Sequence, residues 1–224
     1  MSIPEKVAET IIGGFSAPSK MPWLSWSLAA KECITGGRLH AQPGTVCSDC
    51  YALKNMYVFP NVQRAMARRL EALKHPQFVE AFVIALQARY ERGKKTYKFK
   101  GREIKENRFR WHDSGDLQNL AHLRAIVDIA LALPHIRFWL PTREVTVLRQ
   151  WAGDFPPNLA VRYSTPLVGA KLSKLPCGLV LQSTVGRDDD KTVFQCRAPK
   201  QENQCKNCDA CWAVDNLVTN YHLH

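Results

Sequence analysis

The sequence predicts an α/β fold: a partial or complete (β/α) barrel of the TIM type, with a mainly parallel sheet and a C-terminal cysteine-rich segment. Two observations lead to this prediction. From residue 108 onward, short stretches rich in β-branched and aromatic residues alternate with helical stretches, and strands separated by helices build parallel sheets. Polar residues also follow nearly every predicted strand, which is where barrels and open α/β sheets gather their chemistry.

The first half of the chain is expected to contain one strand and two helices before this alternation begins. The segment up to Lys20 shows no clear period, and Trp23–Ala30 is predicted as a short strand. Apolar residues at three- and four-residue spacing predict a helix over Tyr51–Leu73, and Pro76 suits the first turn of a second helix that runs to about Arg92. The next residues are interpreted as a β-hairpin or a loop that leads into a strand at Arg108–His112.

The second half supplies the regular alternation. The predicted elements are a helix over Leu117–Leu133, a strand over His135–Leu140, a helix over Glu144–Trp151, and strands over Leu159–Tyr163 and Leu179–Gln182. We therefore expect one curved, mainly parallel sheet whose neighbouring strands lie near Trp26, Trp111, Phe138, Val161 and Val180.

Length and composition are those of an ordinary folded chain. The 224 residues suit a single domain (1–224) with an N-terminal cysteine loop (31–51) and a C-terminal cysteine-rich cap (190–224). The 46% apolar and 23% charged residues exclude disorder. No stretch approaches the roughly 20 apolar residues of a membrane span, and no apolar secretory signal follows Met1–Lys6. We therefore expect a cytoplasmic protein with no membrane partner.

Four of the eight cysteines form a C-terminal group, at Cys196, Cys205, Cys208 and Cys211. Two-residue spacers allow successive thiolates to turn toward one centre, and four thiolates complete an iron–sulfur cluster or a tetrahedral zinc site. A reducing cytosol argues against disulfides. The spacing favours an iron–sulfur cluster, most readily [4Fe-4S], with zinc and unrelated buried thiols as the alternatives.

Three further cysteines, Cys33, Cys47 and Cys50, form an N-terminal group. Three thiolates leave one iron of a cuboidal cluster open, or hold a [3Fe-4S] cluster, unless a fourth ligand comes from elsewhere in the fold or the thiols are unrelated. An open iron could bind a small molecule. The eighth cysteine, Cys177, is interpreted as a small buried apolar residue and not as a ligand.

The polar residues after the strands provide candidates for substrate binding, namely His112, Asp113, Asp116 and Arg143. The two aspartates could bind an amino group or act as an acid/base pair, although Asp116 also suits a helix N-cap before Leu117. His112 could donate a proton or be a satisfied buried histidine. Arg143 could hold a carboxylate or phosphate, or pair with one of the aspartates.

Positive charge is concentrated in one short stretch. The chain carries a net charge of +11, which points to an acidic partner, and ten Lys and Arg residues against three Glu lie between Arg89 and Arg110. Together with the aromatic residues beside them, these cations have the composition of a site for single-stranded nucleic acid, which makes nucleic acid a candidate partner of residues 89–110. The alternative is a solvated helix end and hairpin.

The cysteine loop after the first strand, which closes with Cys47-Ser48-Asp49-Cys50-Tyr51, resembles a variant of the radical S-adenosylmethionine superfamily. That resemblance implies a partial (β/α) barrel and three cysteines around an open iron, although thirteen residues separate Cys33 from Cys47 where those enzymes have three. More closely, the chain resembles the phage-encoded gene product 88 family. The matching segments span nearly the whole chain: 19–22, 25–28, 47–52, 110–116, 138–139, 142–143, 158–164 and 205–212.

These observations lead to one function and two rivals. The favoured function is a phage-type viral iron–sulfur protein of the host cytoplasm with redox or radical-type capacity, and S-adenosylmethionine is a candidate ligand of the open iron. Whether the chain is an enzyme stays open. One rival is a structural iron–sulfur or zinc protein whose basic face binds nucleic acid, and the other is a simple electron carrier.

Overall fold

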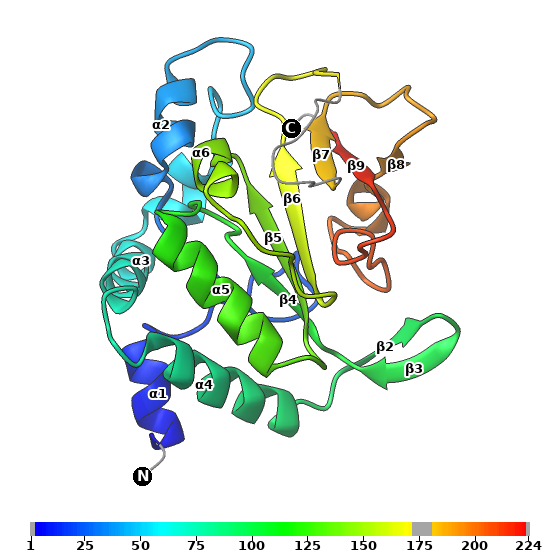
Figure 1. The fold of residues 1–224 in the computed structure, drawn as a ribbon. Coiled ribbons are helices and arrows are strands. Elements are labelled where there is room, and N and C mark those ends of the chain that lie inside the picture. The colour runs from blue at the N-terminus through cyan, green and yellow to red at the C-terminus, as the bar shows by residue number, and fades with distance from the viewer. Residues whose placement is uncertain (1–2, 172–180, 223–224) are drawn as a thin grey trace.

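A seven-stranded parallel sheet forms the centre of the molecule. The computed structural model describes residues 3–171 and 181–222, and the sheet has the order β1-β4-β5-β6-β7-β9-β8 (Figure 1). Every neighbouring pair is parallel. The strands are β1 (Ser25–Trp26), β4 (Arg108–Trp111), β5 (Arg137–Thr142), β6 (Leu159–Ser164), β7 (Gln182–Val185), β8 (Phe194–Gln195) and β9 (Val218–Tyr221).

This arrangement confirms the predicted α/β fold with a mainly parallel sheet. A closed barrel is not found, because the described strands form an open sheet with β1 and β8 at its edges. The first half of the predicted strand at Leu179–Gln182 lies outside the described residues, as does Cys177, and β7 begins at Gln182. No helix in the described part of the chain has the length and apolar character needed to cross a membrane.

Helices cover one face of the sheet. In Figure 1, α1 (Glu5–Ile11), α3 (Pro60–Ala72), α4 (Phe78–Arg92) and α5 (Leu120–Ala132) lie to the left of the strands or in front of them, and the short α6 (Val145–Arg149) follows β5. The core between helices and sheet is rich in aromatic rings. Phe82 of α4 stacks on Trp111 of β4 with ring centroids 4.7 Å apart, and neither ring is exposed. Burial of such large rings contributes most of the apolar stabilisation of this layer.

Several helix boundaries differ from the predicted ones. The helix expected from Tyr51 begins only at Pro60, because residues 51–58 form two short 3-10 turns. Helix α5 begins at Leu120, where the Asn119 side chain accepts a hydrogen bond from the His122 N–H at 2.9 Å. Two helices were not expected: α1, and α2 (Ile34–His40) inside the cysteine loop.

The opposite face of the sheet is lined by arginines. Side chains alternate between the two faces of a strand, so Arg108 and Arg110 of β4 point away from the core that holds Phe109 and Trp111. The C-terminal cysteine segment packs over this arginine-lined face, to the right of the strands in Figure 1. Here Met21, Trp139 and Trp212 form a second, smaller apolar cluster.

The predicted hairpin is confirmed. Strands β2 (Thr96–Phe99) and β3 (Arg102–Lys105) form an antiparallel pair of their own. The hairpin projects from the body of the molecule at the lower right of Figure 1. It therefore presents its polar side chains away from the core.

Candidate functional site

The three N-terminal cysteines lie together in a loop beside the carboxyl ends of β4 and β5. Cys33 immediately precedes α2, and Gly36 lies in the first turn of this helix. A Cβ atom added to Gly36 would come within 2.9 Å of the Cys33 Cβ and 3.6 Å of the Sγ atoms of both Cys33 and Cys47. The 2.9 Å approach is too short, so any larger residue at position 36 would displace the Cys33 side chain, whereas the two contacts with sulfur are ordinary. Burial raises the pKa of both thiols, and the neighbouring Cys50 raises them further.

Glu144 holds this loop against the sheet. Its buried carboxylate accepts hydrogen bonds from the Thr35 N–H at 2.8 Å and from the Thr35 hydroxyl at 2.7 Å. The loop is tied a second time where the Val46 N–H donates to the Pro166 carbonyl at 2.8 Å. The sequence reasoning missed Glu144, although a carboxylate directly after a strand and beside Arg143 was a signal for it.

Asp116 and Arg143, two of the predicted binding residues, lie beside these cysteines. Asp116 accepts hydrogen bonds from the N–H groups of Leu117 at 2.7 Å and Arg143 at 2.9 Å. It therefore joins the loops after β4 and β5 and does not cap α5. Burial raises the pKa of Asp116 to about 6. Among the described ion pairs none joins Arg143 to Asp113 or Asp116, and the buried Arg143 Nε has no hydrogen-bond partner. The positive charge of Arg143 favours a Cys47 thiolate, against the effect of burial.

Asp113 is surrounded by hydroxyl groups. Its carboxylate accepts hydrogen bonds from Ser25 at 2.6 Å, from Tyr57 at 3.0 Å and from Ser27. The Tyr51 hydroxyl donates to the Asp113 carbonyl. These contacts join β1, the loop after β4 and the turns that follow Cys50. Asp113 thus positions the cysteine loop, and its acceptor capacity is largely used within the protein.

His112 faces the core. It has a positive φ of 52°, and its ring centroid lies 5.2 Å from that of His122 in α5. Neither ring nitrogen of His112 has a hydrogen-bond partner. Burial holds the pKa of His112 well below its usual value and lowers that of His122 to about 3. His112 is therefore a buried neutral histidine, apart from the cysteines.

The four C-terminal cysteines line a single pocket. Cys196, Cys205, Cys208 and Cys211 surround it together with Trp212 and residues of β8 and β9. Burial raises the pKa of Cys205, and it raises that of Cys211 to about 12. The Cys211 Sγ lies 3.1 Å from the Tyr221 hydroxyl. Within residues 3–171 and 181–222, no group of three or more His, Cys, Asp or Glu side chains has the geometry of a metal site, so the sulfurs share this pocket without converging on one point.

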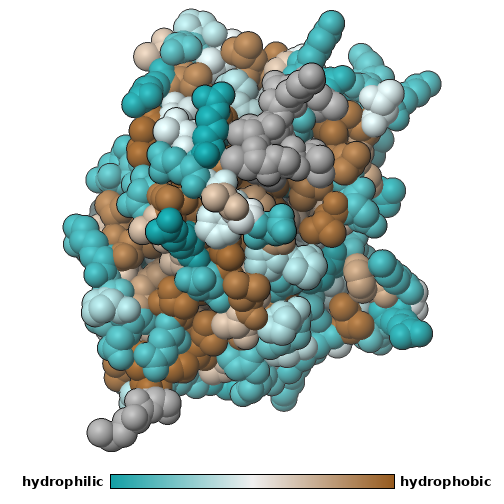
Figure 2. All heavy atoms as spheres, viewed as in Figure 1, coloured by the Kyte–Doolittle hydropathy of each residue, from teal (hydrophilic) through white to brown (hydrophobic). Residues whose placement is uncertain are grey.

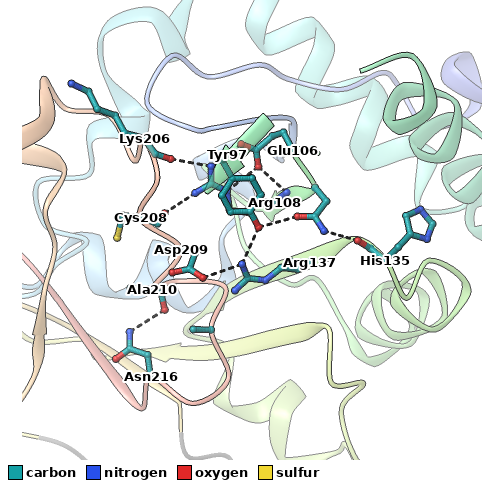
Figure 3. Close-up of polar contacts among 12 residues, drawn as sticks. Tyr97, Glu106, Arg108, His135, Arg137, Lys206, Cys208, Asp209, Ala210 and Asn216 are labelled. Atoms are coloured by element: carbon teal, nitrogen blue, oxygen red, sulfur yellow. Dashed lines mark hydrogen bonds and ion pairs between the residues drawn. The ribbon is translucent and has the colours of Figure 1, made fainter. Parts of the chain in front are cut away.

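This second group lies over the face of the sheet, whereas the three-cysteine loop lies beside the carboxyl ends of the strands. Arginines on that face account for the difference. The Arg108 guanidinium donates to the carbonyls of Lys206 and Cys208, each at 2.9 Å, and forms a buried ion pair with Glu106 at 2.7 Å (Figure 3). Arg137 adds an ion pair with Asp209 at 3.1 Å.

Arg162 of β6 holds the last part of the same segment. It is fully buried and donates hydrogen bonds to the carbonyls of Ala210, Cys211, Ala213 and Asn216 at 2.7 to 2.9 Å. The Trp212 indole N–H donates to the Phe109 carbonyl at 2.8 Å. The sequence reasoning missed this role of the arginines. The signal was their alternation with aromatic residues in Arg108-Phe109-Arg110-Trp111, which indicates a strand with two different buried faces.

The comparisons with known proteins bear on the chain as a whole. No curated protein and no solved structure matches it significantly. One family model does match, that of Gene product 88, over residues 5–214. This range takes in the sheet up to the start of β9, the three-cysteine loop and all four cysteines of the C-terminal pocket. The chain therefore belongs to the Gene product 88 family.

Proposed function

We propose that this chain is a phage-encoded iron–sulfur protein with two cysteine-ligated centres, and that it acts in the host cytoplasm. The observation that carries the proposal is the pocket lined by Cys196, Cys205, Cys208 and Cys211. Four cysteines that line one pocket are typical of a metal site or of disulfide bonds. The reducing cytosol disfavours disulfides, so we favour a metal.

The chemistry of the C-terminal pocket suits a thiolate-bound metal. Burial raises the pKa of Cys205 and Cys211, so these thiols are neutral at pH 7 unless a cation offsets the cost of charging them. The arginine hydrogen bonds to the Lys206, Cys208 and Cys211 carbonyls orient the turns that carry the thiols. Such outer contacts commonly fix the ligands of a metal site. This centre would be saturated by its four thiolates and would contribute to folding.

The N-terminal group would hold the second centre. Cys33, Cys47 and Cys50 supply three thiolates, which leave one iron of a [4Fe-4S] cluster open, or suit a [3Fe-4S] cluster. Beside them lie the unpartnered Arg143 Nε and the Asp116 carboxyl. A small molecule with carboxylate and amino groups, such as S-adenosylmethionine, would be oriented by these two side chains. The cluster, when bound, would supply single electrons, which is the basis of the proposed redox or radical-type capacity.

The fold supports the same proposal. Strands β1, β4, β5, β6 and β7 follow one another in the sheet in chain order, which is the order of part of a (β/α) barrel. The three-cysteine loop lies beside the carboxyl ends of these strands, where such folds carry their active sites. The resemblance to the radical S-adenosylmethionine superfamily implies the same placement.

Anaerobic purification followed by iron, sulfide and zinc analysis and electron paramagnetic resonance tests the proposal directly. We expect brown protein that contains iron and sulfide, with the reduced protein giving cluster signals. Colourless protein with stoichiometric zinc would overturn the iron–sulfur assignment in favour of a structural zinc protein. Protein free of any metal after reconstitution with iron and sulfide would overturn the proposal of metal centres altogether.

Single cysteine variants separate the two centres. Cys208→Ser is expected to lose the C-terminal centre and to lower the stability of the whole chain, because a structural metal site contributes directly to folding. Cys47→Ser is expected to lose only the N-terminal centre. Cys177→Ser is the matched control, since Cys177 belongs to neither group, and should retain all the iron. Equal iron loss in all three variants would contradict the assignment.

The ligand of the N-terminal centre is tested by adding S-adenosylmethionine to the reduced protein. We expect the resonance spectrum of that centre to change, and Cys47→Ser to abolish the change. Arg143→Gln should retain the cluster and weaken the response about tenfold or more, through loss of one charged contact. The exposed Arg149, the last residue of the following helix α6, gives the control Arg149→Gln. An unchanged spectrum in the wild-type protein would exclude S-adenosylmethionine as a ligand of this centre and would favour the alternative function of a simple electron carrier.

A further inference from the structure

A second pocket lies between the root of the hairpin and the C-terminal cysteine segment. Three parts of the chain line it: Ser19–Pro22, Lys95–Tyr97 and the residues around Lys206. Glu106 and Arg108 complete the lining. The volume is about 140 Å³, several times the ~30 Å³ that one water occupies in the liquid. Neither cysteine group contributes a sulfur to this pocket.

Positive charge dominates the pocket. Its lining contains four cationic side chains, Lys20, Lys95, Lys206 and Arg108, against the single carboxylate of Glu106. That carboxylate is already bonded by Arg108 through both oxygens, at 2.8 and 2.7 Å. Among the described ion pairs, none involves Lys20 or Lys95. Lys206 is paired with Glu202 at 3.4 Å, and the Lys95 amine donates a hydrogen bond to the Pro22 carbonyl at 2.7 Å. The charges of Lys20 and Lys95 are thus neutralised by no described ion pair, and an anion in the pocket would pair with them.

The hairpin continues the same positive surface. Much of the basic stretch is used within the fold: Arg89 and Arg92 pair with Glu9 and Glu5 of α1, and Arg108 is buried. The exposed cations that remain are concentrated on the hairpin, at Lys98, Lys100 and Arg102. Figure 2 shows mostly hydrophilic side chains at its projecting end, at the right of the view. Lys95 and Thr96 belong both to the root of the hairpin and to the pocket.

We propose that this pocket and the hairpin β2–β3 form a binding site for the phosphodiester backbone of single-stranded nucleic acid. One phosphate enters the pocket beside Lys20 and Lys95, and the following phosphates lie along Lys98 and Lys100. Arg102 is paired with Phe99 and so lies on the other face of the hairpin, whereas Glu103 is paired with Lys98. A recess admits a phosphate of a flexible strand, whereas a duplex is a stiff cylinder that cannot bend into it at low cost. The proposed contacts are with phosphates, because the half-buried Phe99 ring is already covered by the Arg137 guanidinium at 4.4 Å and the Lys100 amine at 5.6 Å from its centroid.

The test uses the metal-loaded protein and a fluorescein-labelled single-stranded 20-mer, with binding followed by anisotropy at several salt concentrations. Lys20→Gln reports on the pocket and the double variant Lys98→Gln/Lys100→Gln on the hairpin. Each is expected to weaken binding by at least about threefold. Each should also reduce the slope of log K against log salt by about 0.7 for each phosphate contact removed. Lys74→Gln, an exposed lysine beyond α3, is the control and should bind as the wild type does.

Iron content and the urea midpoint are measured for every variant, so that loss of binding is distinguished from loss of fold. Unaltered binding by both the pocket and the hairpin variants would overturn the proposal. A duplex of the same length that binds as tightly as the single strand would also overturn it. If inorganic phosphate or a mononucleotide binds as tightly as the 20-mer, the pocket takes a free phosphate compound and the hairpin has no part in the site.

Discussion

Two neighbouring histidines, His112 and His122, are buried as neutral side chains in the core. Their ring centroids lie 5.2 Å apart, and the Nε2 atoms of both have no hydrogen-bond partner. Burial lowers both pKa values, that of His122 to about 3. A histidine in the unfolded chain titrates near 6.5, so the unfolded state binds more protons below that pH. These histidines therefore contribute stability that is present above pH 6.5 and is lost as the pH falls.

The difference in histidine pKa between the folded and the unfolded chain predicts a loss of stability in mild acid. Between pH 7.5 and 5.5, His122 alone should lower the free energy of unfolding by about 1 kcal/mol. Urea unfolding at the two pH values measures the loss. His122→Leu should show a smaller pH-dependent loss than the wild type by that amount, whereas His75→Gln, at an exposed position, should match the wild type. An identical loss in all three proteins would show that His122 does not contribute.

A substitution at Gly36 is expected to disturb the N-terminal cysteines. A Cβ at this position in α2 would come within 2.9 Å of the Cys33 Cβ, which must then move toward its neighbour Cys47 or away from it, whereas a Cβ at Gly37 would meet nothing within 4 Å. We expect Gly36→Ala to displace these cysteines and to lose iron from the N-terminal centre while the C-terminal centre is retained. Gly37→Ala should keep both centres and stabilise the protein by about 0.5–1 kcal/mol, because alanine favours helix. Iron analysis and urea unfolding distinguish the two variants.

At the scale of elements, the C-terminal cysteine segment depends on the sheet beneath it. The fully buried Arg162 donates to the carbonyls of four residues of this segment. Without the guanidinium, several of these carbonyls would be buried and unsatisfied, and each such group is costly. The segment has little regular secondary structure of its own to compensate for that loss.

Arg162→Met is therefore expected to lower the free energy of unfolding by about 3 kcal/mol or more. It should also speed the reaction of Cys208 and Cys211 with a thiol reagent, because the segment that carries them is no longer held. Arg149→Met, at an exposed position on α6, is the control and should change stability by less than about 0.5 kcal/mol. Equal thiol reactivity in both variants would mean that the segment holds its conformation without Arg162.

Elements with strong local patterns were predictable from the sequence. Helix α4 was expected from Pro76 to about Arg92 and extends over Phe78–Arg92, and β4 was expected within one residue of its bounds. By contrast, α1 is only seven residues long and is stabilised by packing, since Ala8 and Ile12 are fully buried. Helix α2 contains Gly36 and Gly37, which disfavour helix, and forms where Glu144 bonds Thr35. Such tertiary contacts leave no local pattern.

For the molecule as a whole, cysteine spacing predicted two groups of thiols. In the structure the four C-terminal cysteines line one pocket, and a Cβ on Gly36 would lie 3.6 Å from the Sγ atoms of both Cys33 and Cys47. The spacing did not indicate where the C-terminal group lies. That position depends on Arg108 and Arg162, which come from strands about 50 to 100 residues away in the chain. The basic stretch was likewise only partly interpretable, because a buried arginine and an exposed lysine contribute equally to a count of charge.

The sheet order also has a consequence for synthesis on the ribosome. Strand β9 lies between β7 and β8, so β8 has no partner until β9 has been made. At a translation rate of about 5–20 residues per second, the interval between Val185 and Tyr221 lasts roughly 2–7 s. During this interval Arg108 and Arg162 have been made, but the carbonyls that they bind in the finished protein have not all followed. The nascent chain therefore passes through a stage in which this face of the sheet is uncovered, and the C-terminal pocket, which Thr219 of β9 helps to line, forms only after that stage.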